Sequence, residues 1–273
     1  MASVASALVQ KLNRFLPLSE VELASLAGLE ARRRPIPAHT EVVHERQQGH
    51  HVFILQEGWA CAYKLLPDGG RQVIDFSVPG DFMGLRSVLL RTSDHAFAAV
   101  SDIVVAEVAA RQMIDTFQRM PRRGAAILWA ASRDEAMVVE HLVSIGRRSA
   151  LVRTAHLLLE LGLRLQLVGL GSDSGFTCPL NQYLLADALG LTAIHVNRVL
   201  RQLRERGQRL LAPLGEEPQG EHRVHLAHHE LQLAAGAVEI DPRPAAQRQP
   251  LLDRLAGLGE HRADPLEVRA PDH

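Results

Sequence analysis

Two stretches with apolar residues at helical spacing follow one another in residues 180–206, LNQYLLADALGLTAIHVNRVLRQLRER. The first predicts a helix over Gln182–Leu189, which Gly190 ends because glycine adopts a positive φ at little cost. Thr192 then predicts the N-cap of a second helix, since its hydroxyl can accept a hydrogen bond from a free backbone N–H. The second helix carries a predicted buried stripe with spacing i, i+3, i+4 and i+7, formed by Val196, Val199, Leu200 and Leu203.

The opposite face of this second helix is polar and basic. At 100° per residue it presents Ile194, Asn197, Arg198 and Arg201, with His195 on one flank. A helix that is packed on one side and rich in Arg and Asn on the other, after a turn with glycine, is typical of a helix-turn-helix. We therefore expect this segment to read DNA, with Arg198 contacting a base and His195 either contacting phosphate or lying on a solvated flank.

Short β-like runs separated by turn signals fill the region from about residue 37 to residue 108. Turns are indicated by Glu57-Gly58, by Pro67-Asp68-Gly69-Gly70 and by Pro79-Gly80-Asp81. Strands at such regular spacing predict an antiparallel barrel or jelly roll. The predicted strands are Val52–Leu55, Trp59–Leu65, Arg71–Val78, Phe97–Val100 and Ile103–Val108.

Helical patterns flank this region on its N-terminal side. Helix is predicted over Ala2–Leu29, with an interruption at Pro17 and a restart at the capping box formed by Ser19 and Glu22. The three arginines at 32–34 are interpreted as solvated surface charge.

A long helix is predicted over Arg122–Ile145, after a short helix over Met113–Met120 that Pro121 ends. A short heptad seam runs along the long helix, and we expect it to join two copies of the chain; a helix lying on the barrel is the alternative. The seam consists of Leu128, Ala131, Glu135, Val138, Leu142 and Ile145.

After a hinge at 146–148, helix is predicted over Ser149–Val168 and a loop over Gly169–Gly175. Beyond the two DNA-reading helices, Gln208–Leu211 and Arg223–Leu226 predict the hairpin that forms the wing of a winged helix. We therefore expect an α+β protein in four parts, of which the last is disordered. These parts are a sensory domain at 1–121, a dimerisation helix at 122–146, a winged helix-turn-helix at 147–235 and a tail at 236–273.

The charge is distributed unevenly along the 273 residues. The net charge is −1, yet residues 147–209 carry nine arginines against four acidic side chains. A basic segment on an otherwise acidic chain is the charge distribution expected of a protein that reads DNA. The sequence shows no signal region and no apolar run long enough to span a bilayer, so we expect a cytoplasmic protein without membrane contact.

Candidate chemistry outside the basic segment is sparse. Cys61 and Cys178 lie far apart and show no spacing typical of a disulfide framework, zinc or an iron–sulfur cluster. The histidines that cluster at 39, 44, 50 and 51 are interpreted as surface residues, and we predict no metal site. No motif of a hydrolase, P-loop enzyme or metalloprotease occurs in a convincing context, so we expect no enzyme activity.

Three blocks in order resemble the family of the catabolite activator protein and the fumarate–nitrate reduction regulator, the Crp/Fnr family. They are EGWACAYKLLPDGGRQVIDFSVPGDFMG at 57–84, RTAHLLLELGLRL at 153–165 and PLNQYLLADALGLTAIHVNRVLRQLRERG at 179–207. The resemblance covers roughly residues 10–235. It implies a homodimeric transcription regulator that has a cyclic-nucleotide-binding-like barrel and binds a palindromic site in double-stranded DNA. RNA polymerase is a further candidate partner.

The resemblance assigns DNA contacts residue by residue. Arg198 stands where the family places an arginine on guanine. Ile194 replaces the family's usual glutamate, and Asn197 replaces a usual Ser or Gly, which implies a different half-site. Gln182 and Thr192 match positions that hold phosphates in relatives.

The effector site departs further from the family pattern. Cyclic-AMP binders resemble one another in a Gly-Glu-Leu segment and a later Arg-Ser pair, whereas here Gly84-Leu85-Arg86 and Ser93-Asp94 stand at these places. Without that carboxylate and that arginine, and with an Asp near the phosphate, we do not expect cyclic AMP to bind. The cysteines that hold an iron–sulfur cluster in oxygen-sensing relatives are absent before Cys61, so that cofactor is not expected either. The effector stays unidentified.

The alternative to DNA binding is a function in protein assembly. The barrel could bind a signal while the helix-turn-helix serves only assembly with other proteins. The exposed arginines of the second helix favour DNA instead.

Overall fold

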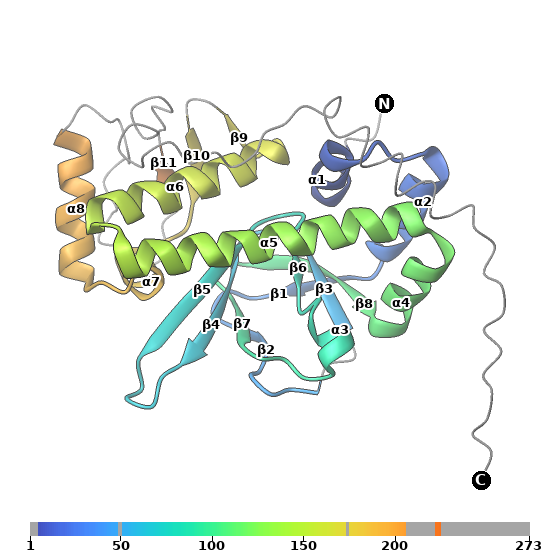
Figure 1. The fold of residues 1–273 in the computed structure, drawn as a ribbon, viewed down its shortest axis with the longest axis horizontal. Coiled ribbons are helices and arrows are strands. Elements are labelled where there is room, and N and C mark those ends of the chain that lie inside the picture. Colours follow the sequence, from blue (N-terminus) through green and yellow to red (C-terminus); the bar gives the residue numbers. More distant parts are fainter. Residues whose placement is uncertain (1–4, 49–50, 173–174, 206–221, 225–273) are drawn as a thin grey trace, which may run out of the picture.

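The computed structural model describes residues 5–48, 51–172, 175–205 and 222–224. It has two N-terminal helices, a barrel of two antiparallel sheets, one long helix that crosses the barrel, and a C-terminal helical unit (Figure 1). The helices are α1 Ala7–Phe15, α2 Glu20–Leu29, α3 Ser87–Leu90, α4 Ala110–Arg119, α5 Pro121–Arg147, α6 Ala150–Leu167, α7 Gln182–Leu189 and α8 Ala193–Glu205. The strands are β1 Arg33–Ile36, β2 Glu41–Val43, β3 His51–Glu57, β4 Ala60–Leu65, β5 Arg71–Ser77, β6 Phe82–Met83, β7 Ala96–Ala99, β8 Ile103–Ala109, β9 Gly171–Ser172, β10 Gly175–Cys178 and β11 His222–Val224.

The barrel confirms the predicted antiparallel fold. One sheet has the order β1-β8-β3-β6 and the other the order β2-β7-β4-β5. Apolar side chains from both sheets fill the interior, because inward and outward positions alternate along each strand. Fully buried members of this core include Leu55, Ala60, Met83 and Val105.

Four short elements of the barrel were not predicted: β1, β2, β6 and α3. Arg33 and Arg34 are exposed, as the surface interpretation required, but their backbone also forms β1 and pairs antiparallel with β8. Each of these elements has only two to four residues, too few to show a period, and the strands form through pairing with distant partners.

The N-terminal helix begins later than predicted. It starts at Ala7, because the Ser6 side chain caps it by accepting a hydrogen bond from the Val9 N–H at 3.3 Å. The predicted helical residues 2–4 lie outside the described part of the chain. The capping box of Ser19 and Glu22 at the start of α2 is confirmed. At the end of α1, the Phe15 ring stacks on Trp129 of α5 with 4.8 Å between centroids, which fixes α1 against the long helix.

The long helix α5 confirms the predicted single helix and extends it slightly at both ends. Pro121 occupies its first turn, where a missing N–H leaves no hydrogen bond unmade. One face, including Ala126, Ile127 and Ala130, is completely buried against the rest of the chain. Because α5 runs from the N-terminal helices to the C-terminal unit, it contacts both halves of the molecule (Figure 1).

The segment before α7 differs from the prediction. The predicted loop at 169–175 contains β9, which pairs with β10 across Gly171 and Phe176. Strand β11, part of the predicted second wing strand, pairs with β10 through Phe176 and Val224. The predicted first wing strand at 208–211 and the tail at 236–273 lie outside the described residues.

The C-terminal unit packs directly on the barrel. One hydrophobic cluster includes Trp59 and Phe76 of the barrel and Leu158 and Leu200 of the C-terminal unit. At its edge, Arg71 of β5 forms an ion pair with Asp187 of α7 at 2.7 Å. Neighbouring Gln72 donates a hydrogen bond to the Ala188 carbonyl at 3.3 Å. The hairpin β4–β5 therefore holds α7 in a defined position.

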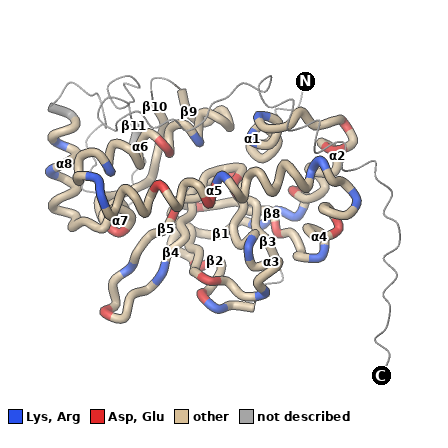
Figure 2. Tube along the Cα trace, in the orientation of Figure 1, with Lys and Arg blue, Asp and Glu red and all other residues tan. Residues whose placement is uncertain are grey.

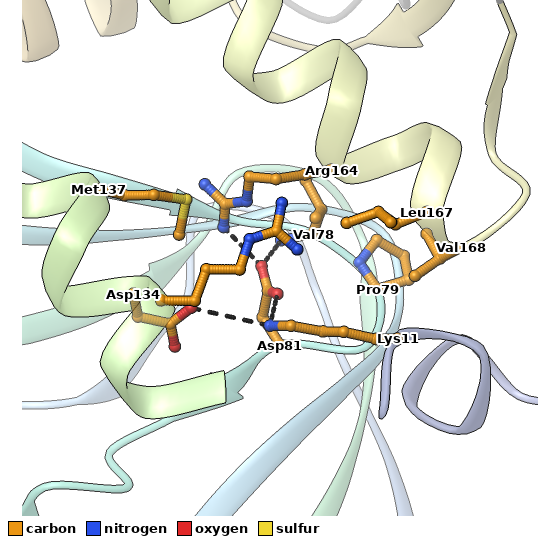
Figure 3. A pocket seen from close by; sticks show the side chains of 10 residues that line it. Lys11, Val78, Pro79, Asp81, Asp134, Met137, Arg164, Leu167 and Val168 are labelled. Carbon is orange, nitrogen blue, oxygen red and sulfur yellow. Dashed lines mark hydrogen bonds and ion pairs between the residues drawn. The ribbon is translucent and has the colours of Figure 1, made fainter. Parts of the chain in front are cut away.

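A buried ionic cluster joins α1, the barrel and α6 next to α5 (Figure 3). Asp81, in the loop after β5, accepts hydrogen bonds from Lys11 of α1 at 2.7 Å and from Arg164 of α6 at 2.6 Å. Arg164 also binds Asp75 of β5 at 2.8 Å and Glu160 at 3.3 Å. Burial alone would raise the pKa of Asp81, but the charges of Lys11 and Arg164 hold it well below its usual range.

Candidate nucleic-acid interface

Local hydrogen bonds set the angle between α7 and α8. The Asn181 side chain caps α7 by accepting from the N–H groups of Tyr183 and Leu184, both at 3.0 Å. Gly190 ends the helix at φ +60°, and Thr192 Oγ1 accepts from the His195 N–H at 3.2 Å to cap α8. The predicted breaks at Gly190 and Thr192 are confirmed, and the two helices form a helix-turn-helix.

The inner face of α8 is the predicted apolar stripe. Val196, Val199, Leu200 and Leu203 are each at most 3% exposed and belong to the cluster shared with α6 and α7. Such burial fixes the rotation of the helix about its own axis. The opposite face must therefore point away from the protein.

The outer face of α8 presents the predicted reading residues. Ile194 is 76% exposed, which is a high value for a large apolar side chain. It therefore contributes little to packing within the single chain. Figure 2 shows basic positions along α8, at the end of the molecule away from α1 and α2. The face consists of Ile194, Asn197, Arg198 and Arg201, all exposed, with exposed Thr192 and half-buried His195 and Gln182 at its edges.

These side chains offer complementary chemistry to a DNA groove. An arginine fork such as that of Arg198 matches the O6 and N7 atoms of guanine, and an asparagine matches adenine in the same way. Ile194 brings no hydrogen-bonding group and suits the methyl group of thymine. The remaining polar and cationic groups suit phosphates.

The predicted seam on α5 lies on its outer side. Leu142 is 71% exposed, Leu128 62%, Val138 41% and Ile145 40%. Glu135 is exposed in the middle of this stripe and Ala131 is half-buried. The seam is therefore an apolar surface that the single chain leaves uncovered.

The residues predicted at the effector site lie beside α3, and their polar groups are paired with one another or with His95. Arg86 forms an ion pair with Asp94 at 3.1 Å, and Asp94 also faces His95 Nδ1 at 2.8 Å. The Ser93 hydroxyl donates to the His95 carbonyl at 2.6 Å. The nearby Gly84 has φ +78° and Leu85 is half-buried. An anion at this place would have to displace Asp94 from Arg86.

Several functional contacts were missed by sequence reasoning. The Asn181 cap could have been found, since Asn before an apolar helical run is a common N-cap. The ion pair between Arg71 and Asp187 joins residues 116 positions apart in the chain, and that between Arg164 and Asp81 joins residues 83 apart. No local pattern signals such pairs.

None of the helices in the described part of the chain is both long and apolar enough to cross a membrane.

Comparison with known proteins agrees with this arrangement. The cyclic nucleotide-binding domain model matches residues 33–120, and the Crp-like helix-turn-helix domain model matches residues 152–208. The nitrogen fixation regulation protein FixK of Bradyrhizobium diazoefficiens is 33% identical over 193 residues, 69% of this chain and 79% of FixK. The transcriptional activatory protein AadR of Rhodopseudomonas palustris is 30% identical over 174 residues, 63% of this chain and 70% of AadR.

Solved structures show the same fold. FixK2 from Bradyrhizobium japonicum superposes with a TM-score of 0.65 at 26% identity, covering 76% of this chain and 98% of FixK2. A CRP-family regulator from Thermus thermophilus, at 20% identity, reaches a TM-score of 0.57 over 75% of this chain and its own full length. Both domain models occur in the family's order, and the relatives are regulators of transcription. The chain belongs to the Crp/Fnr family of DNA-binding transcription regulators.

Proposed function

We propose that this regulator acts as a homodimer that grips a palindromic DNA site with one α8 helix from each protomer. The observation that carries the proposal is the outer face of α8, where Ile194, Asn197, Arg198 and Arg201 are exposed together. A packed inner face holds them in one orientation. We place this activity in the cytoplasm and assign the chain no enzymatic reaction.

We assign sequence readout to three of these residues. Arg198 would contact guanine, Asn197 adenine and Ile194 a thymine methyl group. Because Ile194 cannot accept a hydrogen bond from cytosine, the preferred half-site differs from that of relatives with glutamate there. Phosphate contacts would come from Gln182, Thr192, His195 and Arg201, and would set affinity and salt dependence.

We assign dimerisation to the seam on α5. Its apolar side chains recur by three and four residues and are exposed in the single chain, which fits the same surface of a second copy. A two-fold axis along this seam would place two α8 helices to read two half-sites on successive turns of DNA.

We propose that the barrel perceives a signal other than a cyclic nucleotide. Gly84, Leu85, Arg86, Ser93 and Asp94 remain its candidate residues. The ion pair between Arg86 and Asp94 supports the exclusion of a cyclic phosphate, since a carboxylate already holds the one guanidinium of that set. RNA polymerase is a further proposed partner of the DNA-bound dimer.

The assigned role of Arg198 can be tested with the full chain and an Arg198→Ala variant. On a site selected from random DNA, loss of one bidentate base contact should weaken binding by about 1–3 kcal/mol per half-site. Binding to unrelated DNA should change little. Arg111→Ala, which removes an exposed arginine from α4, serves as the control and should leave both affinities unchanged. Equal weakening on both kinds of DNA would mean that Arg198 contacts phosphate and reads no base.

A further inference from the structure

A pocket lies where the barrel, α5 and the C-terminal unit meet. It is lined by Asp75 of β5, His141 and Ser144 of α5, and Arg153 and His156 of α6, among others. Asp75, His141 and Glu160 each offer one possible ligand atom for a metal ion. These three atoms lie within 4.8 Å of one another. These three residues come from three elements that the fold brings together.

His141 has the orientation of a metal ligand. Its Nδ1 lies 3.0 Å from the Ile74 carbonyl oxygen, and because that oxygen can only accept, Nδ1 must carry a proton. The other ring nitrogen, Nε2, faces Glu160 Oε2 at 2.7 Å. A histidine that donates one N–H to a backbone carbonyl while its second nitrogen faces a carboxylate is the arrangement that outer-shell contacts impose on metal-binding histidines.

Contact with Arg164 also fixes the orientation of the Glu160 carboxylate. Glu160 is 1% exposed, and Arg164 binds its Oε1 at 3.3 Å, which leaves Oε2 toward His141. Arg164 also donates to both carboxylate oxygens of Asp75, to Oδ1 at 2.8 Å and to Oδ2 at 3.3 Å. The guanidinium thus orients both carboxylates from outside and partly balances their charge.

A second, independent observation comes from His156. This side chain is only 3% exposed, yet within the described part of the chain neither ring nitrogen has a hydrogen-bond partner. The Glu140 Oε2 atom lies 3.7 Å from Nε2, which is too far for a hydrogen bond. His156 stands one helical turn before Glu160, so both project from the same face of α6. A buried imidazole without a hydrogen bond costs free energy unless something else uses its lone pair.

We propose that this pocket binds one divalent transition-metal ion, of the class of Zn²⁺ or Co²⁺, through His141, His156, Glu160 and Asp75. Two imidazole nitrogens and two carboxylate oxygens form a donor set that such ions accept in four-coordinate sites. Around an ion with bonds of about 2.0–2.2 Å the ligand atoms stand roughly 3.3–3.6 Å apart. The atoms of Asp75, His141 and Glu160 already lie within 4.8 Å of one another, whereas His156 lines the same pocket outside this group and would have to turn toward the ion. The ion replaces the proton on His141 Nε2, and that proton passes to solvent.

The site would tie the barrel to the DNA-binding unit. Asp75 belongs to the barrel, His141 to the long helix, and His156 and Glu160 to the first helix of the C-terminal unit. An ion held by all of them stabilises the packed arrangement of these parts. Any effect of the ion on DNA rests on the proposed function, but its binding can be measured without DNA.

The test uses the full chain, stripped of metal with a chelator and titrated with Co²⁺ while the visible ligand-field bands are recorded. The wild type should bind one Co²⁺ per chain tightly, and Zn²⁺ should displace it. His156→Leu is the most informative variant, because it removes a ligand without breaking a hydrogen bond or an ion pair of Arg164. Loss of an outer-shell contact costs roughly 10–100-fold in metal affinity, so loss of a direct ligand in His156→Leu or His141→Gln should cost about 100-fold or more.

His44→Gln is the matched control, since His44 is an exposed histidine near a carboxylate, with Glu41 at 2.9 Å, on a different part of the barrel. It should leave the tight site intact. Wild-type protein without a tight site, or a tight site that survives in both His156→Leu and His141→Gln, would overturn the proposal. Circular dichroism of each variant separates loss of the site from loss of the fold.

Discussion

The exposed seam on α5 makes a quantitative prediction for Leu142→Glu. Leu142 is 71% exposed in the single chain. Full burial of a leucine side chain contributes about 1.5–3 kcal/mol, so burying the exposed part contributes about 1–2 kcal/mol in each protomer. Because a two-fold axis would bury Leu142 of both protomers, the two side chains together would stabilise the dimer by about 2–4 kcal/mol. Since each 1.4 kcal/mol is tenfold, the dimer dissociation constant should rise by about 30- to 700-fold.

Glutamate adds a further penalty at this position. It places two like charges at the seam, one heptad after the exposed Glu135. Sedimentation equilibrium over a range of protein concentrations measures the dissociation constant directly. DNA binding at low protein concentration should weaken in parallel, because a monomer grips one half-site only.

Val21→Glu is the control for this experiment. Val21 on α2 is 70% exposed, which matches Leu142, but it lies on a different helix from the seam. The variant should dimerise like the wild type. If Leu142→Glu also dimerised like the wild type, the seam on α5 would not be the contact between protomers.

Two further predictions concern single side chains. Thr192→Ala removes the cap of α8 and should lower the free energy of unfolding by about 1 kcal/mol in urea denaturation, whereas Thr192→Ser keeps the cap and should stay close to the wild type; equal loss in both variants would contradict the capping role. Burial raises the pKa of Cys61 to about 11 and that of Cys178 to about 12, so at pH 8 both thiols should react with Ellman's reagent at least about 100-fold more slowly in the native protein than in denaturant. A thiol that reacts at the unfolded rate in the native protein would show that one of these sites opens readily.

The helix-turn-helix could be predicted from the sequence because its signals are local. Gly190, Thr192 and the apolar stripe of α8 act within a few residues of one another, and the structure has them as expected. The turn signals also predicted the positions of the longer strands and the antiparallel fold of the barrel. Strands such as β1 form through pairing with a distant strand, here β8, and are too short to show an alternating pattern in the sequence.

The junction between the domains could not be predicted. Lys11, Asp81 and Arg164 meet from three regions of the chain, and nothing near any of them indicates its partners. The same holds for His141 and Glu160, on two helices that the prediction assigned to different domains. Packing between distant segments decided each of these cases.

The most direct test of the central proposal is selection of binding sites from random double-stranded DNA by the full chain. The proposed dimer should enrich one inverted repeat, with half-site centres about one helical turn (roughly 10 base pairs) apart. Each half-site should contain a guanine. Replacing that guanine should weaken DNA binding by the wild type more than it weakens DNA binding by the Arg198→Ala variant. Enrichment of no sequence, or of a single unrepeated one, would contradict a dimer that reads DNA through two α8 helices.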